Sequence, residues 1–220
     1  MTRTITVKGV GNVSAKPDYI TVSMSIESIN ESYDNALMEA GKRIEMLQSA
    51  AVDAGYEKDA VKTTRFNVMT RYESKKDRQG NYRQEFVGYA CKYDLKLSFD
   101  FDSKQLARVI SAIAKSGGRP ELGIAFTVKN PAKVSEALLK SAAENARAKA
   151  EILCQASGTQ LGQLLTIDYN WGELNVMSRT RYDIDELVQP CIAMGVDYAP
   201  EIEPDDIDVS DTVAFVWAIE

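Results

Sequence analysis

The chain has 220 residues, 45% of them hydrophobic, and its 26 basic and 32 acidic side chains give a formal charge of −6. These values are typical of a globular protein, and the negative charge disfavours non-specific binding to nucleic acid or anionic membranes. The sequence contains no histidine, which excludes histidine triads, imidazole general bases and mixed cysteine–histidine zinc sites. No apolar run approaches the roughly 20 residues of a membrane span, so we expect no transmembrane segment.

The cysteines and the N-terminal residues bear on the compartment. Cys91, Cys154 and Cys191 are odd in number and have no Cys-x-x-Cys spacing, which favours free thiols over disulfides or a metal site. The first residues are strand-like at once and lack the apolar core of an export signal. We therefore expect a cytoplasmic protein for the sequence as written. If a leader was removed from a longer sequence, the protein is exported to the periplasm instead.

The first two predicted strands lie on either side of Pro17. The strand over 4–13 is interrupted by Gly9-Val10-Gly11, which predicts a bulge, a tight bend or a close approach of another backbone. The glycines also resemble the start of a dinucleotide-binding motif, but a strand follows them where that motif needs a helix. The second strand has a strict alternation that predicts one buried face, formed by Ile20, Val22, Met24 and Ile26.

A helix and a long hairpin are predicted next. Asn30 is the predicted cap of a helix that ends at Gly55, and the helix has an apolar face of Tyr33, Leu37, Ala40, Ile44, Leu47 and Ala51. Two strand-like runs over 61–72 and 87–99 flank turn-forming residues at 77–81. We therefore predict an antiparallel hairpin over 61–99.

The second half begins with a short helix over 102–116 and a strand over 122–128. A long helix follows, for which Asn130 is the predicted cap, Pro131 the first residue and Gly158 the terminator. One of its faces is narrow and mostly alanine, comprising Leu138, Ala142, Ala146, Ala150 and Leu153. Small side chains allow close approach to a flat surface, so we expect this helix to lie on a β-sheet.

The last third contains two further strands and an irregular segment. Alternation over 165–171 predicts a strand, and residues 172–204 read as a long excursion with a short helix near 185–188. A final strand over 207–219 is long enough for a central position in a sheet. The acidic residues Asp206 and Asp208 alternate with apolar neighbours, which indicates a solvated strand face rather than a calcium loop.

The order of these elements suggests an internal repeat. Pro17 and Pro120 each open a strand, a long helix follows each strand, and two more strands follow each helix. We predict a single α+β domain of two β-α-β-β units, about 1–100 and 118–220, joined by the helix over 102–116. The sheets should be mainly antiparallel, with the helices packed on one face.

The predicted hairpin carries the candidate interaction surface, which consists of Arg71, Tyr72, Lys75, Lys76, Arg78, Tyr82 and Arg83. Such a mixture could stack against and neutralise a nucleic-acid strand, but Glu73, Asp77 and Glu85 dilute its charge. We therefore favour contact with further copies of the chain. No nucleophile, metal or cofactor constellation is present, so we expect no enzyme and no cofactor; a pair such as Lys16 and Asp18 is the residual enzymatic candidate.

The chain resembles the SIMPL-domain family of bacterial periplasmic immunogenic and oxidative-stress-defence proteins. The resemblance rests on GVGNVSAKPDY at 9–19, Gly88-Tyr89, GIAFTVKNP at 123–131 and AENARAKAEILCQASGTQLGQLLTI at 143–167. It implies an α+β fold with two related halves and, in some members, homo-oligomers. It brings no agreed activity or catalytic residues. Many relatives begin with an export signal, whereas this sequence begins in the family's first strand.

These observations lead to two functional hypotheses. The first is a non-enzymatic interaction or assembly protein, linked to stress defence or the cell envelope by the resemblance alone. The alternative is a small-ligand or nucleic-acid binding module that uses the helix-free sheet face or the hairpin over 61–99.

Overall fold

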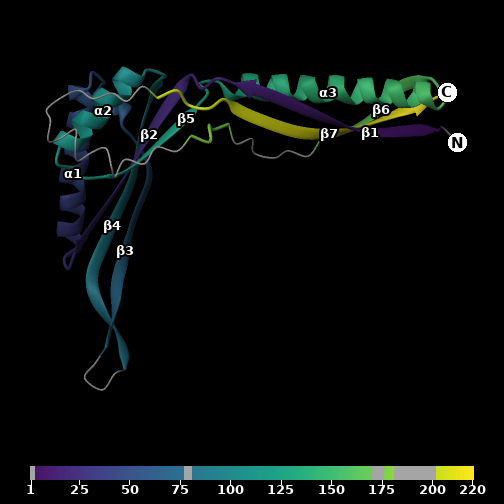
Figure 1. Cartoon of the computed structure of the whole chain (residues 1–220). Helices are drawn as coiled ribbons and strands as arrows, with labels where there is room; N and C mark the ends of the chain where they lie inside the picture. The colour runs from purple at the N-terminus through teal and green to yellow at the C-terminus, as the bar shows by residue number, and fades with distance from the viewer. Residues whose placement is uncertain (1–2, 77–80, 170–175, 181–201) are drawn as a thin grey trace. The chain divides into compact units, whose positions relative to one another are not determined.

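The computed structural model describes residues 3–76, 81–169, 176–180 and 202–220. Its strands form a three-stranded sheet, β1-β7-β6, and a four-stranded sheet, β3-β4-β2-β5, which with the helices confirms the α+β class (Figure 1). In chain order the elements are β1 Thr4–Ala15, β2 Tyr19–Asn30, α1 Tyr33–Asp53, the short 3-10 helix η1 Lys58–Ala60, β3 Lys62–Lys76, β4 Tyr82–Asp100, α2 Ser103–Lys115, β5 Glu121–Thr127, α3 Pro131–Ala156, β6 Leu161–Asp168 and β7 Ile207–Ile219.

The chain divides into two compact units that interleave along the sequence. The first comprises Met1–Asp18, Phe126–Arg179 and Pro204–Glu220, and the second comprises Tyr19–Ala125 and Thr180–Glu203. The orders β2-α1-β3-β4 and β5-α3-β6-β7 both occur along the chain. In the sheets, however, β1 lies beside β7 in the first unit, while β5 pairs with β2. The duplication itself therefore stays a prediction.

The first unit is built around β7, which occupies the centre of its sheet as its length predicted. β1 pairs with β7 in an unbroken antiparallel register from Thr4 opposite Ala218 to Ala15 opposite Ile207. The face of β7 that carries Val213, Phe215 and Trp217 packs against the alanines of α3. Burial of these apolar side chains is the main stabilising contribution in this unit.

Helix α3 begins and ends where its sequence predicts. The Asn130 side chain accepts a hydrogen bond from the Lys133 N–H at 3.4 Å, and Gly158 adopts a positive φ of 70° beyond the C-terminus. The buried face steps by four residues and consists of Val134, Leu138, Ala142, Ala146, Ala150 and Cys154. The prediction that Leu153 belongs to this face was wrong: a step of three residues from Ala150 leads away from the buried row, and Leu153 is exposed.

The close packing of α3 on β1 explains Gly9 and Gly11. A Cβ at Gly9 would overlap the carbonyl oxygen of Ala142, and one at Gly11 would overlap the carbonyl oxygen of Leu138. The expectation of a bulge or bend was wrong, since the register with β7 does not shift here. The alternative expectation, a close backbone approach, is confirmed: glycine on the strand and alanine on the helix let the two backbones meet.

Helix α3 also closes the free edge of β1. The backbone N–H groups of Val10 and Asn12 donate to Asn145 Oδ1 at 3.0 Å and Ser141 Oγ at 3.2 Å. Lys149 Nζ donates to the carbonyl oxygen of Lys8 at 3.3 Å. An edge strand whose outward polar groups are bonded in this way is a poor template for another strand.

The second unit packs α1 and α2 beside its sheet (Figure 1). The predicted inner face of β2 is buried, and α1 contributes Ala36, Ala40, Leu47, Ala50 and Ala51 to the core. The N-terminus of α2 is capped by Asp102, whose carboxylate accepts from the N–H groups of Lys104 and Gln105. Strands β3 and β4 form the predicted antiparallel hairpin.

The start of α1 differs from the prediction. Asn30 is the last residue of β2, and its Oδ1 accepts from the N–H of Ser32 at 3.0 Å. Ser32 occupies the cap position without a side-chain cap bond. Asn30 therefore forms a turn before the helix rather than capping it, because the Asx hydrogen bond competes with capping. Tyr33, expected on the inner face, is exposed at this first helical position.

Arg43 ties α1 to two other backbone segments of the second unit. Its guanidinium donates to the carbonyl oxygens of Gly118 at 2.9 Å, Glu27 at 2.6 Å and Arg119 at 2.8 Å. Arg119 has a positive φ of 45°, which is uncommon for a residue other than glycine. The arginine thus fixes the turn after α2 against β2 and α1.

Replacing Arg43 with methionine should lower the free energy of unfolding by about 2 kcal/mol, because three carbonyl oxygens lose a charged donor. Urea midpoints would measure the change. The matched control is Lys42→Met, at an exposed neighbouring position, which should change stability by less than about 0.5 kcal/mol. Equal midpoints for the two variants would show that the Arg43 contacts contribute nothing.

Of the remaining expectations from the sequence, some can be compared with the structure and others concern residues outside the described ranges. Cys91 and Cys154 are buried free thiols, as predicted, while Cys191 and the predicted helix near 185–188 lie outside the described residues. Of the predicted excursion, Val176 packs with Val128, Val134 and Ile207. The exposed Asp206 and Asp208 flank the buried Ile207, which confirms the predicted alternation. None of the described helices is long and apolar enough to cross a membrane.

Candidate interaction site

Helix α1 covers the base of the β3–β4 hairpin. Near the start of α1, Ala36 and Ala40 pack on Cys91 of β4, with Val68, Tyr89 and Tyr93 around them. Figure 1 shows β3 and β4 continuing past the N-terminal start of α1 toward the tip of the hairpin. Among the described residues, no helix packs against the outer part of the hairpin, and most of its side chains are exposed.

Aromatic side chains connect the helix-covered base to this outer part. The ring of Tyr33 meets that of Tyr89 at 5.6 Å, Tyr89 meets Phe86 at 5.5 Å, and Phe86 meets Tyr72 at 5.6 Å, all edge-to-face. We call these four residues the aromatic row. Tyr72 is 54% exposed and Phe86 43% exposed. Edge-to-face pairs hold such rings in place while much of their apolar surface stays in contact with water.

A register shift produces the aromatic row. The pairing of β3 with β4 shifts between Arg71 and Tyr72, so that Arg71 is opposite Gly88 and Tyr72 is opposite Phe86. Gly88 has a φ of 152°, and a Cβ there would collide with the Asn30 backbone. The irregularity turns Phe86 toward Tyr89, three residues away, which strict alternation would not do.

The predicted surface residues do not form one patch. Arg71 reaches Glu27 Oε1 at 2.9 Å, and Glu27 alternates with the helix-facing Ile26 and Ser28, which places this pair on the helix-free face. Tyr72 instead joins the aromatic row. Toward the tip, Lys75 pairs with Glu85 at 2.8 Å, and Lys76 lies 5.3 Å from the centre of the Tyr82 ring. Arg83 is exposed and lies opposite Lys75 in the strand register. Arg78 lies outside the described residues.

These contacts change the electrostatic character expected of the hairpin. The hydrogen bond from Lys75 to Glu85, and the charge of that carboxylate, raise the pKa of the Lys75 ammonium. Arg71 and Lys75 are thus each committed to a carboxylate within the same chain. Nearer the base, burial raises the pKa of the Tyr93 hydroxyl. The hairpin offers apolar rings flanked by internally compensated charges.

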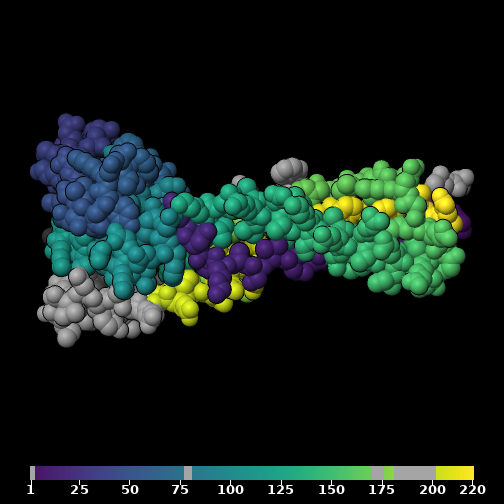
Figure 2. Space-filling model, turned by 90° about the horizontal axis from the view of Figure 1, so that it is seen from above, coloured from purple at the N-terminus to yellow at the C-terminus, as the bar shows by residue number. Residues whose placement is uncertain are grey.

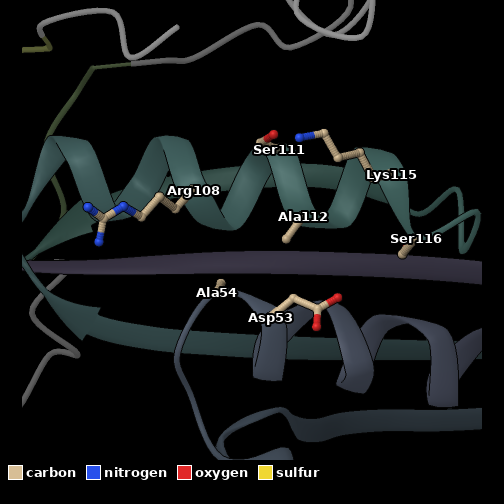
Figure 3. Close-up of a pocket in the computed structure, with 7 residues that line it drawn as sticks. All are labelled: Asp53, Ala54, Arg108, Ser111, Ala112, Lys115 and Ser116. Atoms are coloured by element: carbon tan, nitrogen blue, oxygen red, sulfur yellow. The ribbon is translucent and has the colours of Figure 1, made fainter. Parts of the chain in front are cut away.

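The second unit also contains a groove of about 340 Å³ between α1 and α2. Figure 3 shows Asp53 on α1 and Ala112 on α2 facing each other, with Arg108 and Lys115 on either side of Ala112. Gln105 of α2 donates to the carbonyl oxygen of Ala54 at 2.7 Å, which ties the two helices together. Ser111, Ser116 and Ala54 complete the lining of the groove among the described residues.

A groove of similar volume lies in the first unit between α3, β6 and β7. Phe215 and Trp217 stack at 5.4 Å at its base, Arg147 and Glu151 pair on α3, and Leu164 lines it from β6. In Figure 2 the yellow atoms of β7 are visible beside the green atoms of α3.

Residues weighed for chemistry have structural roles where the structure describes them. The carboxylate of Asp18 accepts from the backbone N–H of Lys129 at 2.6 Å, and this bond fixes the turn before α3. Among the described residues, no group of three or more histidine, cysteine, aspartate or glutamate side chains could hold a metal ion.

The comparison with protein families agrees with this architecture. The model of the SIMPL family, described as a protein of unknown function (DUF541), matches residues 5–217. The chain belongs to the SIMPL family. A search of curated proteins gives no match. The SIMPL match spans both compact units, the hairpin and α3, and it assigns no chemistry to any of them.

Sequence reasoning missed three members of the aromatic row in this SIMPL protein. Tyr33 comes from a different element, and Tyr89 and Phe86 fall on opposite sides of the register shift. The available signal was the run of aromatic residues at 82, 86 and 89 on the strand facing Tyr72.

Proposed function

We propose that this SIMPL protein is a non-enzymatic interaction protein that assembles with further copies of itself through the β3–β4 hairpin. The observation that carries the proposal is the aromatic row, whose rings contact one another and whose outer rings, Tyr72 and Phe86, are about half exposed where none of the described helices covers the hairpin. Tyrosine and phenylalanine are enriched in the cores of protein interfaces, where fixed rings bury apolar area at a low cost in side-chain entropy.

The charges of the hairpin support this assignment over nucleic-acid binding. Phosphate binding needs side-chain cations that are free to neutralise phosphates and so displace the counterions of the nucleic acid. Arg71 and Lys75 are already paired with Glu27 and Glu85. Paired charges at the rim of an apolar contact are compatible with a protein partner. As cellular context we propose stress defence or the cell envelope, which the resemblance to the family suggested.

The proposal is tested by the mass of the protein in solution, measured by light scattering coupled to gel filtration. The variant Tyr72→Ser with Phe86→Ser removes the two most distal rings of the aromatic row. Each is an expected interface hot spot, so together they should weaken assembly by roughly 100-fold. The wild type should be a multimer, and this variant should have a lower mass at the same micromolar concentration.

The matched control removes two equally exposed apolar side chains from α1, by Met38→Ser with Val52→Ser. It should retain the mass of the wild type. A wild type that is strictly monomeric across micromolar concentrations would contradict the proposal, as would a hairpin variant with an unchanged mass.

A further inference from the structure

The two edges of the three-stranded sheet in the first unit differ in how they are closed. The outward backbone groups of β1 are bonded by Ser141, Asn145 and Lys149 of α3. Strand β6 is the other edge. Among the described residues, Leu161–Asp168 pair only with β7, and no hydrogen bond covers the outer side of the strand.

Irregular pairing gives β6 an apolar row along one face. Leu161 is opposite Ile219, Leu164 opposite Trp217 and Ile167 opposite Phe215, with register shifts between them. Since Phe215 and Trp217 pack against α3, these three β6 side chains lie on the α3 side of the sheet at three-residue spacing. Leu164 is 45% exposed and Ile167 56% exposed.

We propose that β6 pairs antiparallel with β6 of a second copy of this chain, joining the two three-stranded sheets into one. The two-fold axis that relates the two β6 strands is perpendicular to the joined sheet, so the rotation keeps each face of the sheet on its own side. A side chain on the α3 face of one copy therefore lies opposite a side chain on the same face of the other copy. Centring the pair on Leu164 places Leu164 opposite itself and Leu161 opposite Ile167. The apolar row of one copy thereby continues into that of the other.

The charges of β6 are compatible with pairing to β6 of a second copy of this chain. Asp168 is the only ionisable side chain within Leu161–Asp168, and in this register it lies opposite Gln160, so no like charges meet. The strand also lacks the lysine or proline that commonly protects an exposed edge. The inference adds a second assembly surface, in a different compact unit, to the proposed self-association through the hairpin.

The test uses charge at the self-facing position in the full-length protein. Leu164→Glu and Leu164→Lys each place two like charges opposite each other, which should weaken this contact by about tenfold or more. Mixing the two variants in equal amounts pairs opposite charges and should restore the mass seen by light scattering. Leu164→Gln is the control: it also removes the leucine but adds no charge, so mixing it with either charged variant should restore less of the mass than mixing the two charged variants.

Circular dichroism of each variant shows whether the fold is retained, and the mixing step compares proteins of matched composition. The proposal is overturned if each charged variant alone has the wild-type mass, in which case the edge is free for an extended segment of another protein. It is equally overturned if the mixture is no larger than its separate components. An unchanged mass in the Tyr72 and Phe86 variant would reject the hairpin contact alone, so the two assembly surfaces can fail independently.

Discussion

Replacing Gly9 with alanine should lower the free energy of unfolding by about 3 kcal/mol or more, the largest effect expected of any substitution considered. The added Cβ would overlap the carbonyl oxygen of Ala142 and approach Ala146 Cβ within 2.7 Å. Neither atom is the end of a flexible side chain, so α3 must move away from β1. Its contacts with Val213, Phe215 and Trp217 would loosen as a consequence.

The control for this substitution is Gly41→Ala. Gly41 lies inside α1, and a Cβ there would meet nothing within 4 Å. The same chemical change should therefore stabilise the protein by roughly 0.5–1 kcal/mol, because alanine is the better helix former. Urea unfolding of both variants measures the difference, and a Gly9→Ala protein as stable as the wild type would disprove the close contact of α3 with β1.

Replacing Ala146 with leucine tests the same contact from the helix. Ala146 is fully buried, and the added methylene groups would be forced against β1, at an expected cost of about 1–3 kcal/mol. Glu144→Leu changes an exposed position two residues away and should alter stability by less than about 0.5 kcal/mol. Equal urea midpoints for the two variants would mean that α3 presents a different face to the sheet.

The sequence predicted helices and strands well where a residue at a given position has a single structural role, such as ending a helix. Asn130, Pro131 and Gly158 marked the ends of α3, and its alanine row correctly predicted close contact with a sheet. The partner of that row was not predictable, because Gly9 and the alanines are separated by more than 130 residues. Sequence periodicity tells which face is buried but not what covers it.

The incorrect or missing predictions have a common cause, because contacts with other parts of the fold decide the local structure at these residues. Asn30 can either cap a helix or form a turn, and the end of β2 decides between them. Arg43 reads as an ordinary polar position on α1, since its three carbonyl partners come from elsewhere in the chain. Alternation along β6 was obscured by two register shifts.

The sequence indicated that the candidate surface lies on the hairpin, but it did not indicate which side chains of the hairpin contact one another. The hairpin followed from the alternation of its strands, and Tyr72, which the sequence analysis placed on the candidate surface, lies in the aromatic row. Alternation along β3 already places the consecutive residues Arg71 and Tyr72 on opposite faces, whereas the contact of Tyr72 with Phe86 depends on the register shift beside Gly88. The pairing of the lysines and arginines with carboxylates likewise depends on cross-strand contacts.

Hydrogen exchange measured by mass spectrometry at two protein concentrations tests the assembly account most directly. If copies meet at the hairpin, amides in the outer parts of Lys62–Lys76 and Tyr82–Asp100 should exchange more slowly at the higher concentration, because assembly covers them. Amides in the C-terminal half of α1, away from Tyr33 of the aromatic row, should exchange at the same rate in both samples. Hairpin exchange that is independent of concentration, in a range where the mass of the protein changes, would contradict assembly through this surface.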